Sequence, residues 1–70
     1  MERIAVKSRD IAIVGYDAET AVLEVAFRDG GVYRYRAVPQ KIYQELMNAP
    51  SMGTYFSKNI KTSFAYEKIH

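Results

Sequence analysis

Apolar side chains along this chain follow two different periods. Over residues 10–36 they recur mainly at every second position, the period of a half-buried β-strand. After Pro39 they recur at every third or fourth position, which is typical of amphipathic helices. The pattern predicts an α+β fold: a three-stranded antiparallel β-meander, then two short α-helices packed on one face, and a short extended C-terminal segment over residues 62–69.

The first predicted strand, Asp10–Tyr16, has apolar residues of both parities. Ile11 and Ile13 point to one face, whereas Val14 points to the other. A bulge near Gly15, or a strand buried in part on both faces, would reconcile the two sets.

The second predicted strand, Ala21–Arg28, alternates regularly. Leu23, Val25 and Phe27 share one face, which we assign to the core. The polar residues of this strand, with Glu24 among them, then lie on the opposite face.

A three-residue loop, Asp29–Gly31, is expected to join the second and third strands. A two-residue loop would set Val25 opposite Arg34 and place a guanidinium group in the core. A three-residue loop with Gly31 in the left-handed conformation avoids this. The resulting register predicts three cross-strand pairs: Phe27 with Tyr33, Val25 with Tyr35, and Glu24 with Arg36.

Two helices are expected in the second half. The first, Pro39–Ala49, begins at a proline that needs no amide donor in the first turn. The second, Met52–Lys61, follows Ser51, a favourable N-cap. Gly53 in its first turn indicates either very close packing or a backbone amide left open for an anion, although Ser51 would itself cap these amides.

The composition excludes several classes of chemistry. The 70 residues, 49% of them hydrophobic, correspond to one domain spanning 1–70. There is no cysteine and His70 is the only histidine, so we expect no enzyme, no metal site and no cofactor. No apolar run is long enough to cross a bilayer, which makes a cytoplasmic protein with no membrane association the expectation.

The run Tyr33-Arg34-Tyr35-Arg36 alternates aromatic and cationic side chains. In proteins that bind single-stranded nucleic acid, aromatic rings stack on bases and cations neutralise phosphates. In a strand, however, the tyrosines point to one face and the arginines to the other. The predicted register turns the tyrosines toward the core, so the arginines are the better binding candidates.

Positive charge is concentrated near the end of the chain. The formal net charge is +2, and the excess comes from the last twenty residues, where three lysines face one glutamate. A positive surface attracts anionic partners. The candidate nucleic-acid-binding residues are therefore Arg28, Arg34, Arg36, Lys58 and Lys61.

An ordered set of positions resembles the KTSC domain, which is named from its occurrence at the C-terminus of some lysyl-tRNA synthetases and also exists as small stand-alone bacterial proteins. The set runs from Val14-Gly15-Tyr16-Asp17 through the central tyrosine-x-tyrosine motif, Val38-Pro39 and Ile60 to Tyr66. Its aromatic members include Tyr33, Tyr35, Tyr55, Phe56 and Tyr66. The resemblance implies a domain of unknown function that has been suggested to bind RNA.

Two positions depart from the KTSC pattern. Ser57 stands where asparagine is common, and Lys61 stands where arginine is common. A lysine keeps the positive charge but loses the bidentate fork of a guanidinium group. If these positions contact a ligand, the affinity of this chain for it differs from that of similar domains.

Two functions remain open from the sequence. The first is a small non-enzymatic module that binds RNA or another single-stranded nucleic acid through a basic surface. The alternative is a protein-interaction or homodimerisation module, because a small sheet exposes its edges and its second face.

Overall fold

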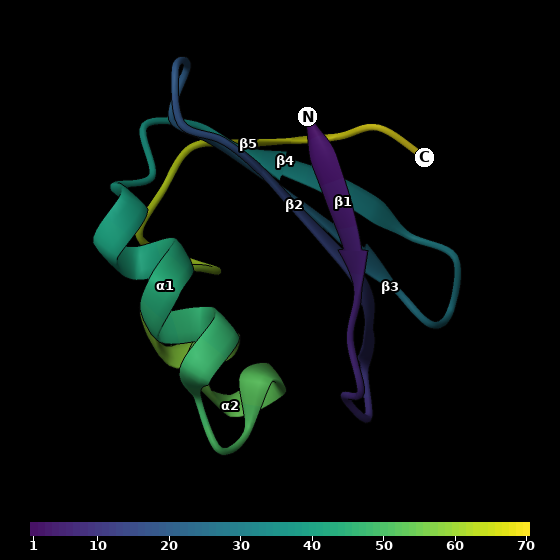
Figure 1. Cartoon of the computed structure of the whole chain (residues 1–70). Helices are drawn as coiled ribbons and strands as arrows, with labels where there is room; N and C mark the ends of the chain where they lie inside the picture. Colours follow the sequence, from purple (N-terminus) through teal and green to yellow (C-terminus); the bar gives the residue numbers. More distant parts are fainter.

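A computed structural model describes residues 1–70. It contains one antiparallel sheet with the strand order β1-β2-β3-β4-β5. Helices α1 (Gln40–Asn48) and α2 (Met52–Asn59) follow β4 in the sequence and pack on one face, here called the inner face (Figure 1). The strands are β1 (Glu2–Ala5), β2 (Ile11–Asp17), β3 (Val22–Phe27), β4 (Val32–Tyr35) and β5 (Tyr66–Lys68).

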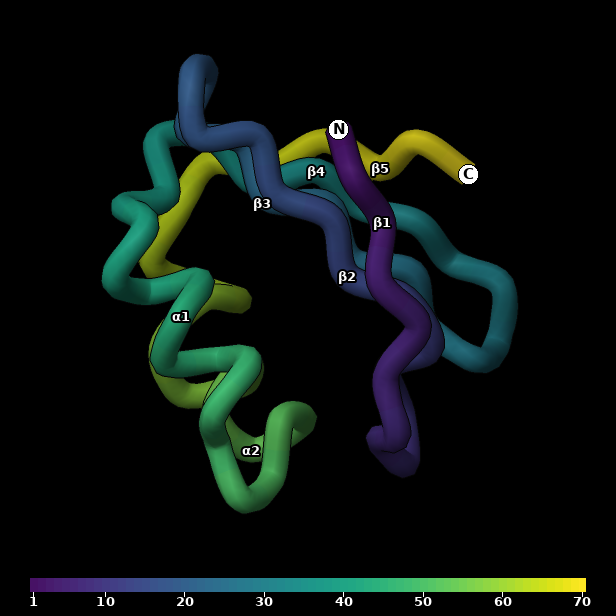
Figure 2. Tube along the Cα trace, in the orientation of Figure 1, coloured from purple at the N-terminus to yellow at the C-terminus, as the bar shows by residue number.

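The α+β class is confirmed, but the prediction of three strands is wrong, because β1 and β5 form the two edges. All four residues of β1 are exposed, so this strand has no buried face that hydrophobic alternation could reveal. The predicted extended C-terminal segment does return to the sheet, where β5 pairs with β4. Figure 2 shows this yellow segment running from behind the helices back along the sheet.

The two parities of β2 are reconciled by a bulge, as expected, but not at Gly15. The pairing with β3 shifts between Ile11 and Ile13. Ile11 and Val14 therefore both point into the core and are fully buried, whereas Ile13 points to the opposite, outer face and is 38% exposed. A bulge turns residues of opposite parity to the same face because it inserts one unpaired position.

The hairpin between β3 and β4 has a different register from the predicted one. The loop has three residues, but they are 28–30, and the left-handed glycine is Gly30 with φ 103°. The Phe27 amide donates to the Gly31 carbonyl at 2.8 Å, and the Gly30 amide donates to the Phe27 carbonyl at 3.0 Å. The observed pairs are Leu23 with Tyr35, Glu24 with Arg34, and Val25 with Tyr33.

This correction shifts the strands by two positions, so every side chain stays on its predicted face. The tyrosines of β4 lie on the inner face and Arg34 lies on the outer one. The loop begins one residue earlier than predicted because Gly30, rather than Gly31, takes the left-handed conformation. Side-chain alternation cannot distinguish two registers of the same parity.

The predicted apolar stripe of α1 is confirmed, and each helix is slightly shorter than predicted. Pro39 is the N-cap of α1, and the Ser51 hydroxyl accepts a hydrogen bond from the Thr54 amide at 3.3 Å. Neither helix is long and apolar enough to span a membrane. The buried core consists of Ile11, Val14, Leu23, Val25, Tyr35, Val38, Leu46, Phe56 and Ile60.

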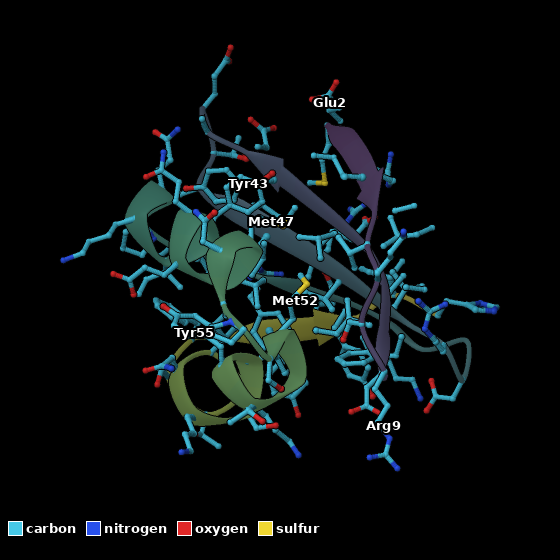
Figure 3. All side chains as sticks on the ribbon, turned by 60° about the horizontal axis from the view of Figure 1, so that its bottom comes forward. Glu2, Arg9, Tyr43, Met47, Met52 and Tyr55 are labelled. Atoms are coloured by element: carbon cyan, nitrogen blue, oxygen red, sulfur yellow. The ribbon has the colours of Figure 1, made fainter.

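Tyrosines hold the helices to the sheet and to each other. The Tyr16 ring stacks on Tyr43 of α1, with centroids 4.7 Å apart and planes 8° apart. The Tyr55 hydroxyl of α2 donates to Glu45 of α1 at 2.7 Å. Burial, together with this carboxylate, raises the pKa of Tyr55 to about 12, so its hydroxyl remains a donor at neutral pH. Figure 3 shows Tyr43 and Met47 at the junction of α1 with the sheet, and Tyr55 between the helices.

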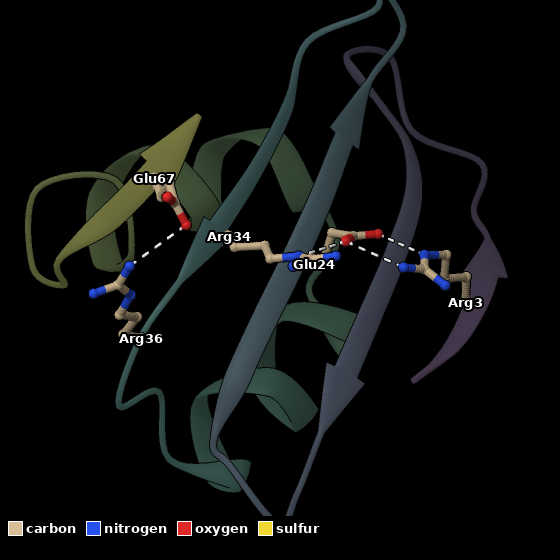
Figure 4. Close-up of polar contacts among 5 residues, drawn as sticks. All are labelled: Arg3, Glu24, Arg34, Arg36 and Glu67. Atoms are coloured by element: carbon tan, nitrogen blue, oxygen red, sulfur yellow. Dashed lines mark hydrogen bonds and ion pairs between the residues drawn. The ribbon is translucent and has the colours of Figure 1, made fainter. Parts of the chain in front are cut away.

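A row of cross-strand neighbours crosses all five strands on the outer face. We call it the charged row, and it consists of Arg3, Gly15, Glu24, Arg34 and Glu67. Glu24 accepts from Arg3 Nε at 2.6 Å and from Arg34 Nε at 2.9 Å, although its side chain is only 7% exposed (Figure 4). Arg36, one residue beyond the end of β4, pairs with Glu67 instead of the predicted Glu24.

Gly15 makes the long reach of Arg3 possible. A Cβ at this position would lie 3.2 Å from Arg3 Cγ and 2.8 Å from Met1 Sδ. Without a side chain on β2, the Arg3 guanidinium passes over that strand to Glu24 on β3. The absence of a side chain at Gly15 therefore allows Arg3 to connect the edge strand β1 with β3 at the centre of the sheet.

Replacing Glu24 with glutamine should lower the free energy of unfolding at pH 7 by about 1–3 kcal/mol, because the hydrogen bonds from Arg3 and Arg34 lose their charged acceptor at a buried position. The hydrogen bond from Arg3, with smaller contributions from Arg34, holds the pKa of Glu24 below its ordinary value of 4.5. This stabilisation is fully present above about pH 5 and is lost as the pH falls through the lowered pKa. Urea denaturation of both proteins should therefore show a smaller difference at about pH 3 than at pH 7.

The matched control is Glu67→Gln, which removes an exposed carboxylate 3.4 Å from an exposed guanidinium. It should change the free energy of unfolding by no more than about 0.5 kcal/mol. Equal effects of the two substitutions would contradict a special role for Glu24.

Candidate functional site

The helices leave part of the inner face open beside β5, and a groove lies there between α2 and strands β4 and β5. Its floor is aromatic and includes Tyr33, Tyr35 and Tyr66. The two tyrosines of β4 point inward, and Tyr66 is the cross-strand neighbour of Tyr35 on β5. Strand alternation thus brings all three rings to the same face.

The floor has a buried part and an exposed part in contact with each other. Tyr35 is 3% exposed and packs edge-on against Phe56 of α2, with centroids 5.4 Å apart. Tyr66 is 58% exposed, and its ring lies 5.5 Å from Tyr35 and 5.9 Å from the half-buried Tyr33. The core therefore supports aromatic surface that is open to solvent at the edge of the sheet.

The buried Tyr35 of the floor keeps its hydroxyl protonated at physiological pH. Burial raises the pKa of Tyr35 above its ordinary value of 10.0, and the neighbouring Tyr66 and Tyr33 raise it further. A hydroxyl that stays protonated adds no negative charge that would repel an anionic ligand.

Cations line the groove together with the aromatic rings. Lys68 is the cross-strand neighbour of Tyr33, and its Nζ lies 5.9 Å from the centre of that ring. Lys61 follows the C-terminal end of α2, and Arg9 precedes β2. These side chains are exposed and, apart from the ring contact of Lys68, form no ion pair or side-chain hydrogen bond. They remain free to meet a ligand.

Arg28 also lines the groove, but its guanidinium group is engaged within the chain. It donates to the Ser8 carbonyl at 2.7 Å and to the Val6 carbonyl at 3.1 Å. These bonds tie the connection between β1 and β2 to the end of β3. The contribution of Arg28 is therefore mainly structural, with its charge a secondary feature of the groove.

The groove contains two carboxylates, Asp10 and Asp29, each adjacent in sequence to an arginine that also lines it. A Cβ on Gly53, near the start of α2, would lie 3.2 Å from Asp10 Oδ2, which indicates close packing, one of the two alternatives for this glycine. Lys61 lies just beyond the other end of the helix, roughly 12 Å along its axis at 1.5 Å per residue. Asp29 belongs to the β3–β4 hairpin.

The structure separates the five cations that the sequence suggested. Arg28 and Lys61 line the groove. Arg34 and Arg36 lie on the outer face, where both bond to glutamates. Lys58 borders a second hollow, between the β1–β2 connection and α2.

Two cationic residues that line the groove, Arg9 and Lys68, were not among the binding candidates named from the sequence. Lys68 had a detectable signal, because it is two positions after Tyr66 and must share its face in an extended segment. Arg9 had none, since its place in the groove depends on how the β1–β2 connection folds. Of the five aromatic candidates, only Tyr55 lies outside the groove, since it contacts α1 instead.

Comparisons with known proteins identify relatives over most of the chain. The KTSC domain family model matches residues 7–64. An uncharacterized protein of Stutzerimonas stutzeri is 43% identical over 61 residues, which cover 87% of this chain and 86% of that protein. A lysine–tRNA ligase of Trichormus variabilis is 46% identical over 54 residues, which cover 77% of this chain but only 10% of the ligase.

The fold matches as well. A crystal structure of a KTSC domain protein from Yersinia pestis superimposes with a TM-score of 0.95 at 39% sequence identity, covering 99% of this chain and 97% of that one. Sequence and structure thus agree over nearly the whole length of the chain. The chain belongs to the KTSC domain family.

Proposed function

We propose that this protein is a non-enzymatic module that binds single-stranded RNA in the groove between α2 and β5. The observation that carries the proposal is the aromatic floor formed by the half-buried Tyr33 and the exposed Tyr66, in a groove that Lys61 and Lys68 also line. Exposed rings next to lysines are the combination that single-stranded nucleic acid requires, because rings stack on bases and lysines neutralise phosphates.

Each part of the groove has a role in this proposal. One base stacks on Tyr66 at the open edge, and a second base stacks on Tyr33 deeper in the groove. Lys68 lies near the distance limit of a cation–π contact with Tyr33 and, being exposed, turns outward to a phosphate when a base takes its place. Lys61 neutralises a phosphate near the C-terminal end of α2. The groove extends about 12 Å along α2, from Gly53 to Lys61, and this length suits a segment of one or two nucleotides.

The relatives support the same proposal. Similar segments make up 10% of proteins named lysine–tRNA ligases, so the family occurs within proteins whose names refer to RNA. This is support by association, since a function must be argued from its site. The outer face offers a weaker alternative for RNA, because its arginines are already paired with glutamates.

Substitution of Tyr66 by alanine should weaken RNA binding by roughly 1–3 kcal/mol, because one stacking ring is lost. Tyr66 is 58% exposed, so the fold should be retained. Lys61→Ala should reduce the slope of log affinity against log salt by about 0.7, the value for one phosphate contact in single strands. Fluorescence anisotropy with a labelled mixed-sequence RNA, at a series of salt concentrations, measures both.

The controls are Arg36→Ala on the outer face and Lys58→Ala at the second hollow. Each removes one cation away from the groove, and each should leave the affinity within about twofold. If Arg36→Ala weakens binding as much as Lys61→Ala does, RNA binds elsewhere than in the groove. Absence of RNA binding at tens of micromolar protein and low salt would exclude the function itself.

As a second candidate function, we propose self-association through the outer face. An apolar row runs beside the charged row, and it consists of Ala5, Ile13, Ala26, Val32 and Ile69. No element of the chain covers this face, and Figure 4 shows both helices behind the sheet. The charges beside the apolar row, those of Arg3, Glu24 and Arg34, are paired within the chain. The outer faces of two copies could therefore pack together without net electrostatic repulsion.

Self-association predicts a sedimentation coefficient that rises with protein concentration, and Ile13→Lys should abolish the rise by placing a charge in the apolar row. Ile4→Lys is a matched control, because Ile4 is also 38% exposed but belongs to the inner face of β1. A monomer at all concentrations would contradict this second function and leave the RNA proposal intact.

A further inference from the structure

We propose that the groove prefers guanine, and that Asp29 reads the base stacked on Tyr33. The inference rests on the proposed RNA-binding function and goes beyond it, since it assigns the base and the residue that recognises it. It arises from a feature that RNA binding alone does not explain, which is a carboxylate held beside the aromatic floor of the groove.

Gly31 allows the Tyr33 ring and the Asp29 carboxylate to lie close together. A Cβ on Gly31 would lie 3.3 Å from Tyr33 Cε1 and 3.4 Å from Asp29 Oδ1, so even a methyl group would be tight between them. The two atoms are thus no more than about 7 Å apart. Both residues line the groove. A base stacked on Tyr33 therefore has one of its edges within reach of the Asp29 carboxylate.

The Asp29 carboxylate is held in place but keeps free acceptor capacity. The Gly31 amide donates to Asp29 Oδ1 at 3.0 Å, which fixes the side chain against its own turn. No cation pairs with it, because the adjacent Arg28 guanidinium donates to carbonyls of the β1–β2 connection. Oδ2 and the second lone pair of Oδ1 remain available to a ligand.

An ionised carboxylate only accepts hydrogen bonds, so it selects a base edge with adjacent donors. Guanine presents two, N1–H and the N2 amino group, on its Watson–Crick edge. Adenine and cytosine each present one amino group beside an acceptor nitrogen, and uracil presents one N–H between two carbonyls. Only guanine engages both carboxylate oxygens without facing a lone pair.

The other carboxylate of the groove, Asp10, has a structural explanation. Its Oδ2 lies against Gly53, in the first turn of α2. Negative charge at this position is favoured by the dipole of the helix. Asp29 has no such partner, and it is the carboxylate that borders the Tyr33 ring. The base-reading role therefore belongs to Asp29.

The test compares two RNA oligomers that differ in one atom group. A short uridine-rich RNA with a single guanosine is measured against the same RNA with inosine, which lacks only the 2-amino group. The wild-type protein should bind the guanosine RNA roughly five- to tenfold more tightly, the lower range for a bidentate base contact. In Asp29→Asn the ratio of the two affinities should fall to about one.

Asp17→Asn is the matched control variant. Asp17 accepts from the Glu19 amide at 3.0 Å, the same kind of turn hydrogen bond, but it lies at the end of β2, outside the groove. This variant loses the same charge and should keep the preference for guanosine. The ratio is measured within each protein, so it does not depend on equal stability of the variants.

The outcomes separate this inference from the function on which it rests. Equal binding of guanosine and inosine RNA by the wild-type protein would overturn the guanine preference and leave RNA binding in the groove intact. A preference that persists in Asp29→Asn would overturn the assignment to Asp29. Absence of RNA binding would overturn both the inference and the proposed function.

Discussion

Glu24 is the residue on which the arrangement of this small sheet depends. It lies at the centre of the outer face, almost fully buried, and accepts hydrogen bonds from arginines on two other strands. A buried carboxylate is tolerated only when it is paired, and this one is paired on both sides. The contacts require Arg3 and Arg34 to point outward, and Gly15 leaves the space for one of them to cross β2. The charged row thereby links β1 to β3 and β4.

The orientation of Arg34 determines the opposite side of the same strand. Because side chains alternate, an outward Arg34 turns Tyr33 and Tyr35 inward. Tyr35 is then buried under α2, whereas Tyr33 lies where the helices no longer cover the sheet. The aromatic floor of the groove is therefore continuous with the core, and the network that organises the outer face also positions the candidate site.

The groove exists because the helical layer is smaller than the sheet. Two helices of nine and eight residues cannot cover five strands, and the edge strand β5 is left open beside α2. Tyr66 on that edge has one side against the core tyrosine and the other in solvent. A chain of this size can bury only a small core, so residues that belong to both the core and the surface provide binding area without enlarging the domain.

Except at the bulge in β2, the sequence by itself determined which residues share a face, because alternation in strands and the 3.6-residue repeat in helices are local properties. It placed the tyrosines inward and Arg34 outward, and it found α1, α2 and the N-cap at Ser51. It also indicated the family, through an ordered set of motif positions. Lys61 and the inward tyrosines, which line the groove, belong to this predictable part.

Only the tertiary structure decided the register, the edges of the sheet and the composition of the groove. The register depends on which glycine takes the left-handed conformation. The predicted and observed registers differ by two positions and place the same residues on each face, so side-chain alternation does not distinguish them. Strand β1 forms because β2 offers it an edge and Glu24 offers Arg3 a partner, although none of its residues is buried. The exposure of Tyr66 follows from its place on the edge strand β5. The position of Asp29 beside Tyr33 follows from the conformation of the β3–β4 hairpin. The contacts of β1, β5 and α2 with the rest of the sheet join residues far apart in the chain, and no local pattern encodes them.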